Sequence, residues 1–534
     1  MDADRPALTR LARVGAAGVP VAFLLVFFAY PVGSIIARGV GDGSVLDVVR
    51  RTSTGDLLWF TTWQAAVSTV ATFAVGLPAA WAIGTQRLPA RRLIRAVVVV
   101  PFVLPTLVVA AAVQALFDAA DVELSGTVTA IVLAHVVLNA AVVIRIVGGW
   151  WALLPTGGEE AARVLGAGRW RAFRAVTLPA LAPALWSAAA IVFLFCFTSF
   201  GIILTVGGPA HPTLETEIWR QATRRTDFTA AAALAVIQLA AVLALVLVTN
   251  VLERRLGRRS TLRPRALRPV RGARRIVAVA AALAPATLLL VLPLATLAAR
   301  SFSVGDGWGL DRYRSLGRVE PGGLNVAAID AVANSLQAAA VACAAAVVIG
   351  GLAAATVVHS RWGRALDVGL MTPLGPSAVT IGFGILVALG RPPLDLRSSW
   401  IIVPLAQALV GIPFVIRAVV PALRGVDDRQ RQAAAVLGAS PLRVRLAVDG
   451  PVALRALLVG AAFAFAISLG EFGATSFLAR PDDPTVPVAM YRLLGRPGEV
   501  LHGQAMALGT VLAVLTALSV LVIERLRPDD AVGW

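Results

Sequence analysis

The sequence predicts an all-α, polytopic membrane protein with about 12 transmembrane helices in two parallel six-helix repeats. Three observations carry this prediction. Apolar residues make up 58% of the 534-residue chain, and the mean hydropathy is +0.80, whereas soluble domains are about 45–50% apolar. Apolar stretches long enough to cross a bilayer recur along the chain. One polar segment also appears twice, at a fixed spacing.

Twelve stretches offer the roughly 20 predominantly apolar residues that a membrane-spanning helix needs. They are residues 14–37, 61–84, 96–117, 124–144, 184–206, 229–252, 276–299, 331–358, 368–390, 398–416, 456–479 and 504–523. The first follows a basic N-terminal segment, as in a signal peptide, but it is longer than the h-region of about 7–15 residues that a signal peptide contains. We therefore expect an uncleaved first span.

The positive charge of the chain follows the predicted topology. All 48 basic residues are arginine, and the formal net charge is +18. Such a charge can indicate nucleic-acid binding, but here arginine concentrates in alternate loops while acids balance it in the others. This positive-inside pattern predicts that both termini are cytoplasmic and that nucleic acid is not a partner. Cys196 and Cys343 fall inside predicted spans, so neither a disulfide nor a metal site is expected.

The chain contains an internal duplication with an offset of 272 residues. At this offset Val164–Ala167 matches Val436–Ala439, and Pro179 matches Pro451. A fixed offset over a long stretch indicates a repeat, and six spans per copy make the repeat parallel. We predict a first six-helix repeat at residues 1–252 and a second at 276–534. The linker 253–275 holds ten Arg, two Pro and one acid, and is predicted to be a solvated cytoplasmic segment that can lie against anionic lipid.

The duplicated polar segment lies between the fourth and fifth predicted span of each repeat, on the inner face. We call Glu159–Pro179 loop A and Arg431–Pro451 loop B. In loop A, an alanine-rich helix is expected from Glu160, Gly166 to end it, and Pro179 to begin the next helix, so that two short helices lie along the membrane face. An amphipathic connector remains the alternative, but it gives no reason to repeat the Gly-to-Pro spacing.

The loop pattern resembles a known family. Glu-Ala-Ala, three residues, Gly, nine residues and then Val-Thr-Leu-Pro is similar to the loop motif of membrane subunits of binding-protein-dependent ABC importers, in which the last element reads Ile-x-Leu-Pro. The resemblance implies a bacterial inner-membrane permease that forms the path for a small solute. Two ATPase copies would bind at the cytoplasmic face, and an extracytoplasmic binding protein would deliver the solute. The residues that it assigns to ATPase coupling are Glu160, Ala161, Ala162, Gly166 and Pro179 in loop A, with Gln432, Ala433, Ala434, Gly438 and Pro451 in loop B.

Loop B departs from the motif, since Gln432 replaces the glutamate and Gly450 replaces the leucine. The length and several local stretches resemble the fused permeases of thiamine and ferric-iron importers. Leu133–Asn139, Phe195–Trp219 and Ser468–Leu478 resemble parts of the thiamine permease, and iron permeases share related versions of the last two. The resemblance therefore favours thiamine or a related cationic nutrient, with ferric iron as the alternative.

No catalytic site is predicted in this chain. A phosphate-binding loop requires a lysine, and the sequence contains none. Energy must therefore come from a separate subunit or from an ion gradient. We expect no enzyme activity, bound metal or cofactor, with ATP used by the partner. A 12-helix secondary transporter is the rival interpretation. An integral-membrane enzyme is less consistent with four scattered His and two Cys.

A translocation path is predicted at paired segments in the fifth span of each repeat. They are Ser199, Phe200 and Gly201 in the first repeat, and Glu471, Phe472 and Gly473 in the second. An intramembrane carboxylate normally faces a bundle interior or a water-filled cavity. Glu471 is therefore expected either to favour a cationic solute or to make an interior hydrogen bond that holds helices together.

Overall fold

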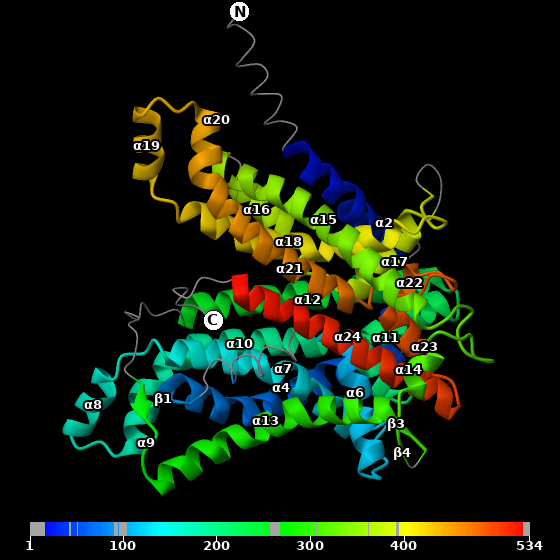
Figure 1. Cartoon of the computed structure of the whole chain (residues 1–534), viewed down its shortest axis with the longest axis horizontal. Helices are drawn as coiled ribbons and strands as arrows, with labels where there is room; N and C mark the ends of the chain where they lie inside the picture. Colours follow the sequence, from blue (N-terminus) through cyan, green and yellow to red (C-terminus); the bar gives the residue numbers. More distant parts are fainter. Residues whose placement is uncertain are drawn as a thin grey trace, which may run out of the picture. The chain divides into compact units, whose positions relative to one another are not determined.

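The computed structural model describes residues 17–41, 44–50, 52–89, 94, 104–256, 267–305, 307–360, 363–390 and 395–526, and this part of the chain is almost wholly helical (Figure 1). The first half contains η1 (Leu25–Ala29), α2 (Tyr30–Gly41), α3 (Ser44–Arg50), α4 (Thr52–Thr85), β1 (Gln86–Arg87), α6 (Thr106–Ala119), α7 (Val128–Trp151), α8 (Gly157–Val164), α9 (Arg169–Ala172), η2 (Phe173–Thr177), α10 (Leu178–Phe197), η3 (Ile203–Gly207), α11 (Leu214–Thr223) and α12 (Phe228–Leu256).

The second half begins with β2 (Arg268–Pro269), and its remaining elements follow in chain order. They are α13 (Ala273–Phe302), β3 (Ser303–Val304), β4 (Gly307–Trp308), α14 (Asp311–Ser315), α15 (Asp330–His359), α16 (Gly363–Met371), η4 (Thr372–Leu374), α17 (Ala378–Ala388), α18 (Ile402–Arg424), α19 (Asp428–Val436), α20 (Pro441–Val444), η5 (Arg445–Asp449), α21 (Gly450–Gly470), α22 (Thr475–Leu478), α23 (Val486–Leu494) and α24 (Glu499–Leu526).

Among the described residues, ten helices are long and apolar enough to cross a membrane. Two shorter apolar helices, α6 and α17, lie where the third span of each repeat is predicted. Residues 96–103 of the third predicted span lie outside the described residues. The all-α, polytopic fold with about 12 apolar helices is therefore confirmed.

Contacts divide the chain into two compact units. The first unit contains the described residues among 1–48, 218–236 and 304–529, and the second contains those among 49–217 and 237–303. In the first unit α2 packs on α17, and in the second unit α13 packs on α4 and α6. The first helix of each half thus packs with helices of the other half. The predicted boundaries at 252 and 276 describe duplication along the chain rather than packing, and they stay a prediction.

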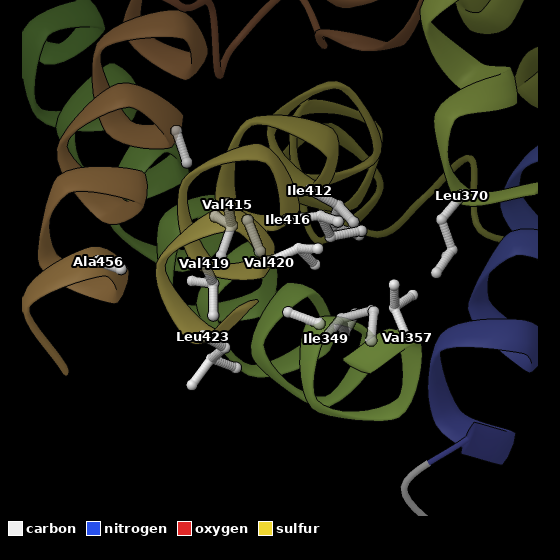
Figure 2. Packing of buried hydrophobic residues seen from close by; sticks show 14 residues of the cluster. Ile349, Val357, Leu370, Ile412, Val415, Ile416, Val419, Val420, Leu423 and Ala456 are labelled. Carbon is white, nitrogen blue, oxygen red and sulfur yellow. The ribbon is translucent and has the colours of Figure 1, made fainter. Parts of the chain in front are cut away.

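The core of the first unit lies where α15, α18 and α21 meet (Figure 2). Val415 of α18 sits between Gly350 and Gly460. A Cβ added to Gly350 would lie 2.9 Å from the Val415 Cβ, and one added to Gly460 would lie 2.9 Å from its Cα. Small residues of this kind let helix backbones approach closely in a membrane, where lipid is as apolar as leucine and packing drives association.

The core of the second unit is built from the corresponding helices. α4 packs along α7, and α10 packs against both. A cluster of buried apolar residues on α4, α7 and α13 includes Ile83, Ile144 and Leu290. The described end of the basic linker joins this unit, because β2 pairs with β1 in parallel through Gln86 and Arg268. Linker residues 257–266 lie outside the described residues.

Candidate coupling loops and transport path

Loop A ends its first helix with a left-handed glycine. Gly166 has a φ of +88°. Its N–H donates to the Arg163 carbonyl at 3.0 Å, and the Ala167 N–H donates to the Ala162 carbonyl at 3.0 Å. These two bonds form a Schellman cap, which satisfies carbonyls at the end of a helix and requires a residue with positive φ. Gly166 therefore ends α8, as its place in the sequence predicts.

Loop B has the same cap at the same repeat position. Gly438 has a φ of +81°. Its N–H donates to the Ala435 carbonyl at 3.0 Å, and the Ala439 N–H donates to the Ala434 carbonyl at 3.1 Å. The cap is made by backbone groups, so the change from glutamate to Gln432 leaves it intact. Residues 160–162 lie on α8 and residues 432–434 lie on α19.

An apolar surface is left uncovered at the tip of each loop. Val164 and Leu165 are each 87% exposed, and Val436 and Leu437 have the same exposed fraction. Farther along each loop, Trp170 and the matching Leu442 are also exposed. Exposed apolar clusters of this kind mark contact surfaces. The Val-Leu pair with Trp170 or Leu442 is called the tip surface of its loop.

The helix that follows each glycine continues directly into a span, which corrects the prediction of a separate second helix along the membrane face. In loop A a single helix runs from Arg169 to Phe197. It widens into the π-helical turn η2 immediately before Pro179, and η5 occupies the matching position before Pro451. Proline lacks an N–H, which would break a regular α-helix. The π-turn accommodates the proline, so the helix continues.

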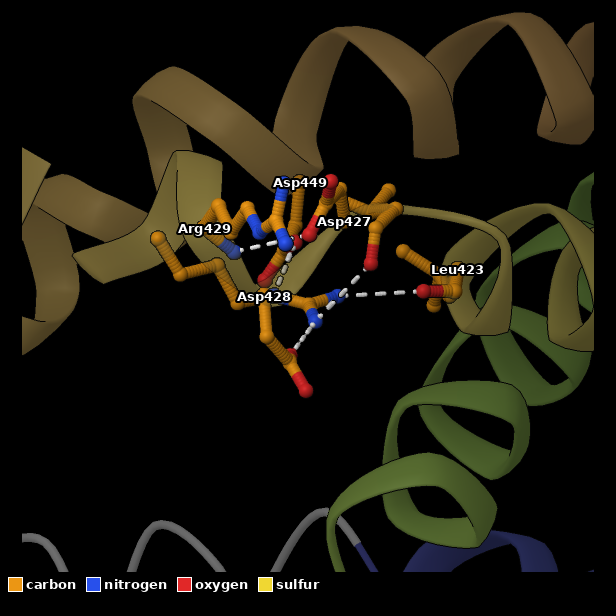
Figure 3. Close-up of polar contacts among 7 residues, drawn as sticks. Leu423, Asp427, Asp428, Arg429 and Asp449 are labelled. Carbon is orange, nitrogen blue, oxygen red and sulfur yellow. Dashed lines mark hydrogen bonds and ion pairs between the residues drawn. The ribbon is translucent and has the colours of Figure 1, made fainter. Parts of the chain in front are cut away.

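A partly buried ion pair anchors loop B (Figure 3). The Arg431 Nε donates to Asp449 Oδ1 at 2.9 Å, and its Nη1 donates to Asp428 Oδ1 at 2.6 Å. Two further bonds reach the carbonyls of Val426 and Leu423. Burial lowers the pKa of Arg431, but hydrogen bonds to Asp428 and Asp449 outweigh it and hold the pKa above its ordinary value.

Loop A does not reproduce this anchor. The repeat positions of Arg431 and Asp449 are occupied by Glu159 and Thr177. The two loops therefore share their backbone cap and tip surface but differ in the side chains that fasten them to their own helices.

The predicted translocation residues lie at breaks between helices: Ser199 and Phe200 are non-helical and Gly201 begins the next helical stretch, while Glu471, Phe472 and Gly473 separate α21 from α22. α10 ends at Phe197, before Ser199, Phe200 and Gly201, and α21 ends at Gly470, before Glu471. Both breaks are buried, since Ser199, Phe200, Glu471 and Phe472 are each at most 7% exposed. Non-helical backbone at membrane depth is tolerated only where protein buries it or where it lines a cavity. Discontinuous helices of this kind build many transporter substrate sites.

The Glu471 carboxylate caps the short helix α22. Its Oε1 accepts from the Ala474 N–H at 2.7 Å, and its Oε2 accepts from the Thr475 N–H at 3.0 Å. These hydrogen bonds are local to residues 471–475, so both roles considered for Glu471, holding helices together and contacting a solute, stay predictions. Next to it, Gly473 touches α17, because an added Cβ would lie 2.8 Å from the Ala378 Cβ.

Sequence reasoning missed a buried acid. Glu215 is fully buried and accepts a hydrogen bond from Gln238. Glu215 lies in the first turn of helix α11, and the matching segment of the second repeat forms α23, in which Val486–Met490 are buried. Its signal in the sequence was the apolar pattern around it, since Leu214 and Ile218 are spaced as one face of a helix.

A cluster of buried polar side chains lies on α4 and α7. The Gln64 Nε2 donates to the Cys196 carbonyl at 2.9 Å, and Ser68 Oγ lies 3.0 Å from His135 Nδ1. Asn139 Nδ2 donates to the His135 carbonyl at 3.0 Å. The polar residues of α4 and of α7 are each four apart, which places them on one helix face. Across the described residues, no three His, Cys, Asp or Glu side chains are grouped so as to hold a metal ion.

Comparison with known proteins identifies the family. Residues 73–261 match the family described as binding-protein-dependent transport system inner membrane component. The molybdenum transport system permease protein ModB of Escherichia coli (strain K12) is 36% identical over 175 residues, which cover 30% of this chain and 76% of ModB. The chain belongs to this transport family.

Two further relatives match most of the permease. The thiamine transport system permease protein ThiP of Brucella abortus (strain 2308) is 27% identical over 96% of this chain and 94% of its own length. A probable ABC transporter permease protein of Sinorhizobium fredii is 26% identical over 84% of this chain and 83% of its own. The protein is therefore a multi-pass, double-length permease component of an ABC importer.

Proposed function

We propose that this permease forms the translocation path for thiamine or a related cationic nutrient. The observation that carries the proposal is the similarity to the Brucella thiamine permease along 96% of the chain. The matches to molybdenum permeases cover only 30% of the chain and support the family rather than the solute. Ferric iron remains the alternative within the same family.

The tip surfaces of loops A and B are proposed to dock two copies of a separate ATPase subunit at the cytoplasmic face. Their support is the identical Schellman cap and the identical exposure of the Val-Leu pair in both loops. A two-fold-related pair of partners needs two matching surfaces. The absence of lysine from the chain supports an ATP site on the partner, with no catalytic site or cofactor on the permease.

The helix breaks at Ser199–Gly201 and at Glu471–Gly473 are each proposed to line the path of the solute, which an extracytoplasmic binding protein delivers. Buried breaks in two matching helices support this path. ATP-driven closure of the ATPase pair would move loops A and B. Each loop continues directly into a spanning helix, so its movement would be transmitted to the helix break at the far end of that helix. The arginine-rich loops support an inner-membrane orientation with both termini cytoplasmic.

Reconstituted transport tests the proposal. The permease is co-purified with its ATPase, placed in proteoliposomes, and mixed with the binding protein and thiamine, ferric iron or molybdate in parallel. ATP hydrolysis and solute uptake should rise together with thiamine only. Stimulation by ferric iron or molybdate alone would reassign the solute. Uptake driven by a proton gradient without ATPase would contradict the importer mechanism.

A further inference from the structure

A cavity of about 960 Å³ opens beside loop A within the second compact unit. Arginines from two separate stretches of the chain line it. Arg163 and Arg169 come from loop A, while Arg271 and Arg274 flank the N-cap of α13. Among the described residues that line the cavity, Glu159 is the only acid. Within the described part of the chain, none of these four arginines forms an ion pair with an acid.

Backbone and side-chain contacts hold the second arginine stretch in place. β2 pairs with β1 through Arg268 and Gln86, and the Arg275 Nε donates to Gln86 Oε1 at 3.0 Å. The first turn of α13 also faces this region, and its N-cap, Gly272, offers no capping side chain. The positive end of a 30-residue helix therefore adds to the guanidinium charges. Like charges at close range repel one another, so an anion bound here would be strongly favoured.

The deeper wall of the same cavity is apolar and belongs to spanning helices. Its lining includes Leu77, Pro78 and Trp81 of α4 with Leu178, Leu181 and Leu185 of α10. Both helices are long enough to cross a membrane. The cavity thus places a cationic rim beside an apolar wall. A free anion needs only the rim, whereas a phospholipid needs both, with its phosphate among the arginines and its acyl chain along the wall. Basic pockets between spanning helices are known to take anionic lipid headgroups.

We propose that this cavity binds the phosphate of an anionic phospholipid, which fastens loop A to the start of α13. The comparison of the two loops supports this role. Loop B is anchored within the chain by Arg431 and Asp449, whereas loop A has Glu159 and Thr177 at those positions. A lipid bound here contacts both loop A and the start of α13, so it makes the position of loop A depend on the surrounding membrane.

Direct binding to the full-length chain, purified in detergent without ATPase, tests the proposal. The probe is phosphatidylglycerol, with phosphatidylcholine and inorganic phosphate titrated separately and retention measured by native mass spectrometry. The variant R163Q/R271Q/R274Q should lose roughly a hundredfold in phosphatidylglycerol affinity, since each arginine near an anionic surface contributes about fivefold. The matched control R424Q/R443Q/R445Q removes the same charge from exposed positions near loop B and should stay within about threefold of the wild type.

The outcomes separate the possible occupants. Equal phosphatidylglycerol binding by the wild type and the cavity variant overturns the proposal. Full competition by inorganic phosphate at equal affinity assigns the site to free phosphate and overturns the lipid. Displacement by polyglutamate at a lower concentration than phosphatidylglycerol assigns the cavity to an acidic protein and also overturns it.

Hydrogen exchange of the wild type keeps the test independent of variant folding. Phosphatidylglycerol should slow exchange in residues 160–172 and 273–276 and leave residues 428–445 unchanged. Equal protection of both regions, or of neither, contradicts a lipid site beside loop A. Neither measurement involves ATP or solute, so their failure leaves the proposed transport function untouched.

Discussion

The anchor of loop B allows two acids on one arginine to be compared directly. Asp449 and Asp428 both pair with Arg431, but the Asp449 side chain is 8% exposed and the Asp428 side chain is 80% exposed. Replacing Asp449 with alanine removes a mostly buried acceptor and leaves a partly buried cation, which should cost about 1.5–3 kcal/mol. Replacing Asp428 removes a solvent-exposed pair and should cost about 0.2–1 kcal/mol.

These free energies refer to local opening of loop B. A cost of about 1.5–3 kcal/mol raises the opening equilibrium constant roughly 10- to 150-fold, whereas about 0.2–1 kcal/mol raises it no more than about fivefold. The N-cap of α19 is unaffected in both variants, because Asp427 still accepts from the Arg429 N–H at 2.9 Å. The difference between the variants therefore reports the burial of the two ion pairs.

Hydrogen exchange measured by mass spectrometry on the full chain is the assay. Peptides covering residues 428–438 should exchange much faster in Asp449→Ala than in Asp428→Ala, while peptides of loop A serve as the internal control. Equal acceleration in the two variants, or a larger effect of Asp428→Ala, would refute the argument that burial sets the strength of each pair. Acceleration in loop A as well would show that Asp449 supports the whole fold rather than loop B.

Five further single variants, in three groups, test the loops and the path. Gly166→Ala and Gly438→Ala place a side chain at positive φ with no atom within 4 Å of the new Cβ. Each should therefore lower the free energy of local loop opening by about 1–2 kcal/mol through backbone conformation alone. Unchanged hydrogen-exchange rates in the loop would contradict the left-handed cap. Leu165→Ser and Leu437→Ser should weaken ATPase binding about tenfold or more without changing the thermal stability of the permease, and unchanged co-purification would remove the docking role of the tip surfaces. Glu471→Gln keeps an acceptor for the α22 backbone but loses the charge, so the fold should persist while thiamine uptake falls; uptake equal to the wild type would limit Glu471 to capping.

The spans, the repeat and the helix stops could be predicted from sequence because each depends on local chemistry. About 20 apolar residues must be helical in lipid, since no water is available to satisfy the backbone. Gly166 and Gly438 end helices because only a residue tolerant of positive φ fits that cap. The loop pattern occurs twice at the same 272-residue offset, and this repetition distinguishes both loops from ordinary connectors.

The helix partners and the surroundings of single polar side chains could not be predicted. Hydropathy predicts that Ala17–Gly41, which contains α2, and Ala273–Phe302, which is α13, span the membrane, but it does not specify which helices they pack against. Close approach decides this, as at Gly384, where an added Cβ would lie 3.0 Å from Ile35 Cδ1. Likewise, an intramembrane acid is expected to face the interior, but whether Glu471 meets a solute or a backbone N–H depends on where α22 begins.

The sequence by itself determined that this protein is a duplicated, all-helical membrane permease with two matching loops, because hydropathy, glycine conformation and repeat spacing are properties of short segments. Only the tertiary structure decided that the first helix of each half packs with the other half, that loop B is anchored by Arg431 while loop A borders a basic cavity, and that Glu471 caps a helix. These features depend on which side chains meet across distant segments, and that is set by the packing of the whole chain.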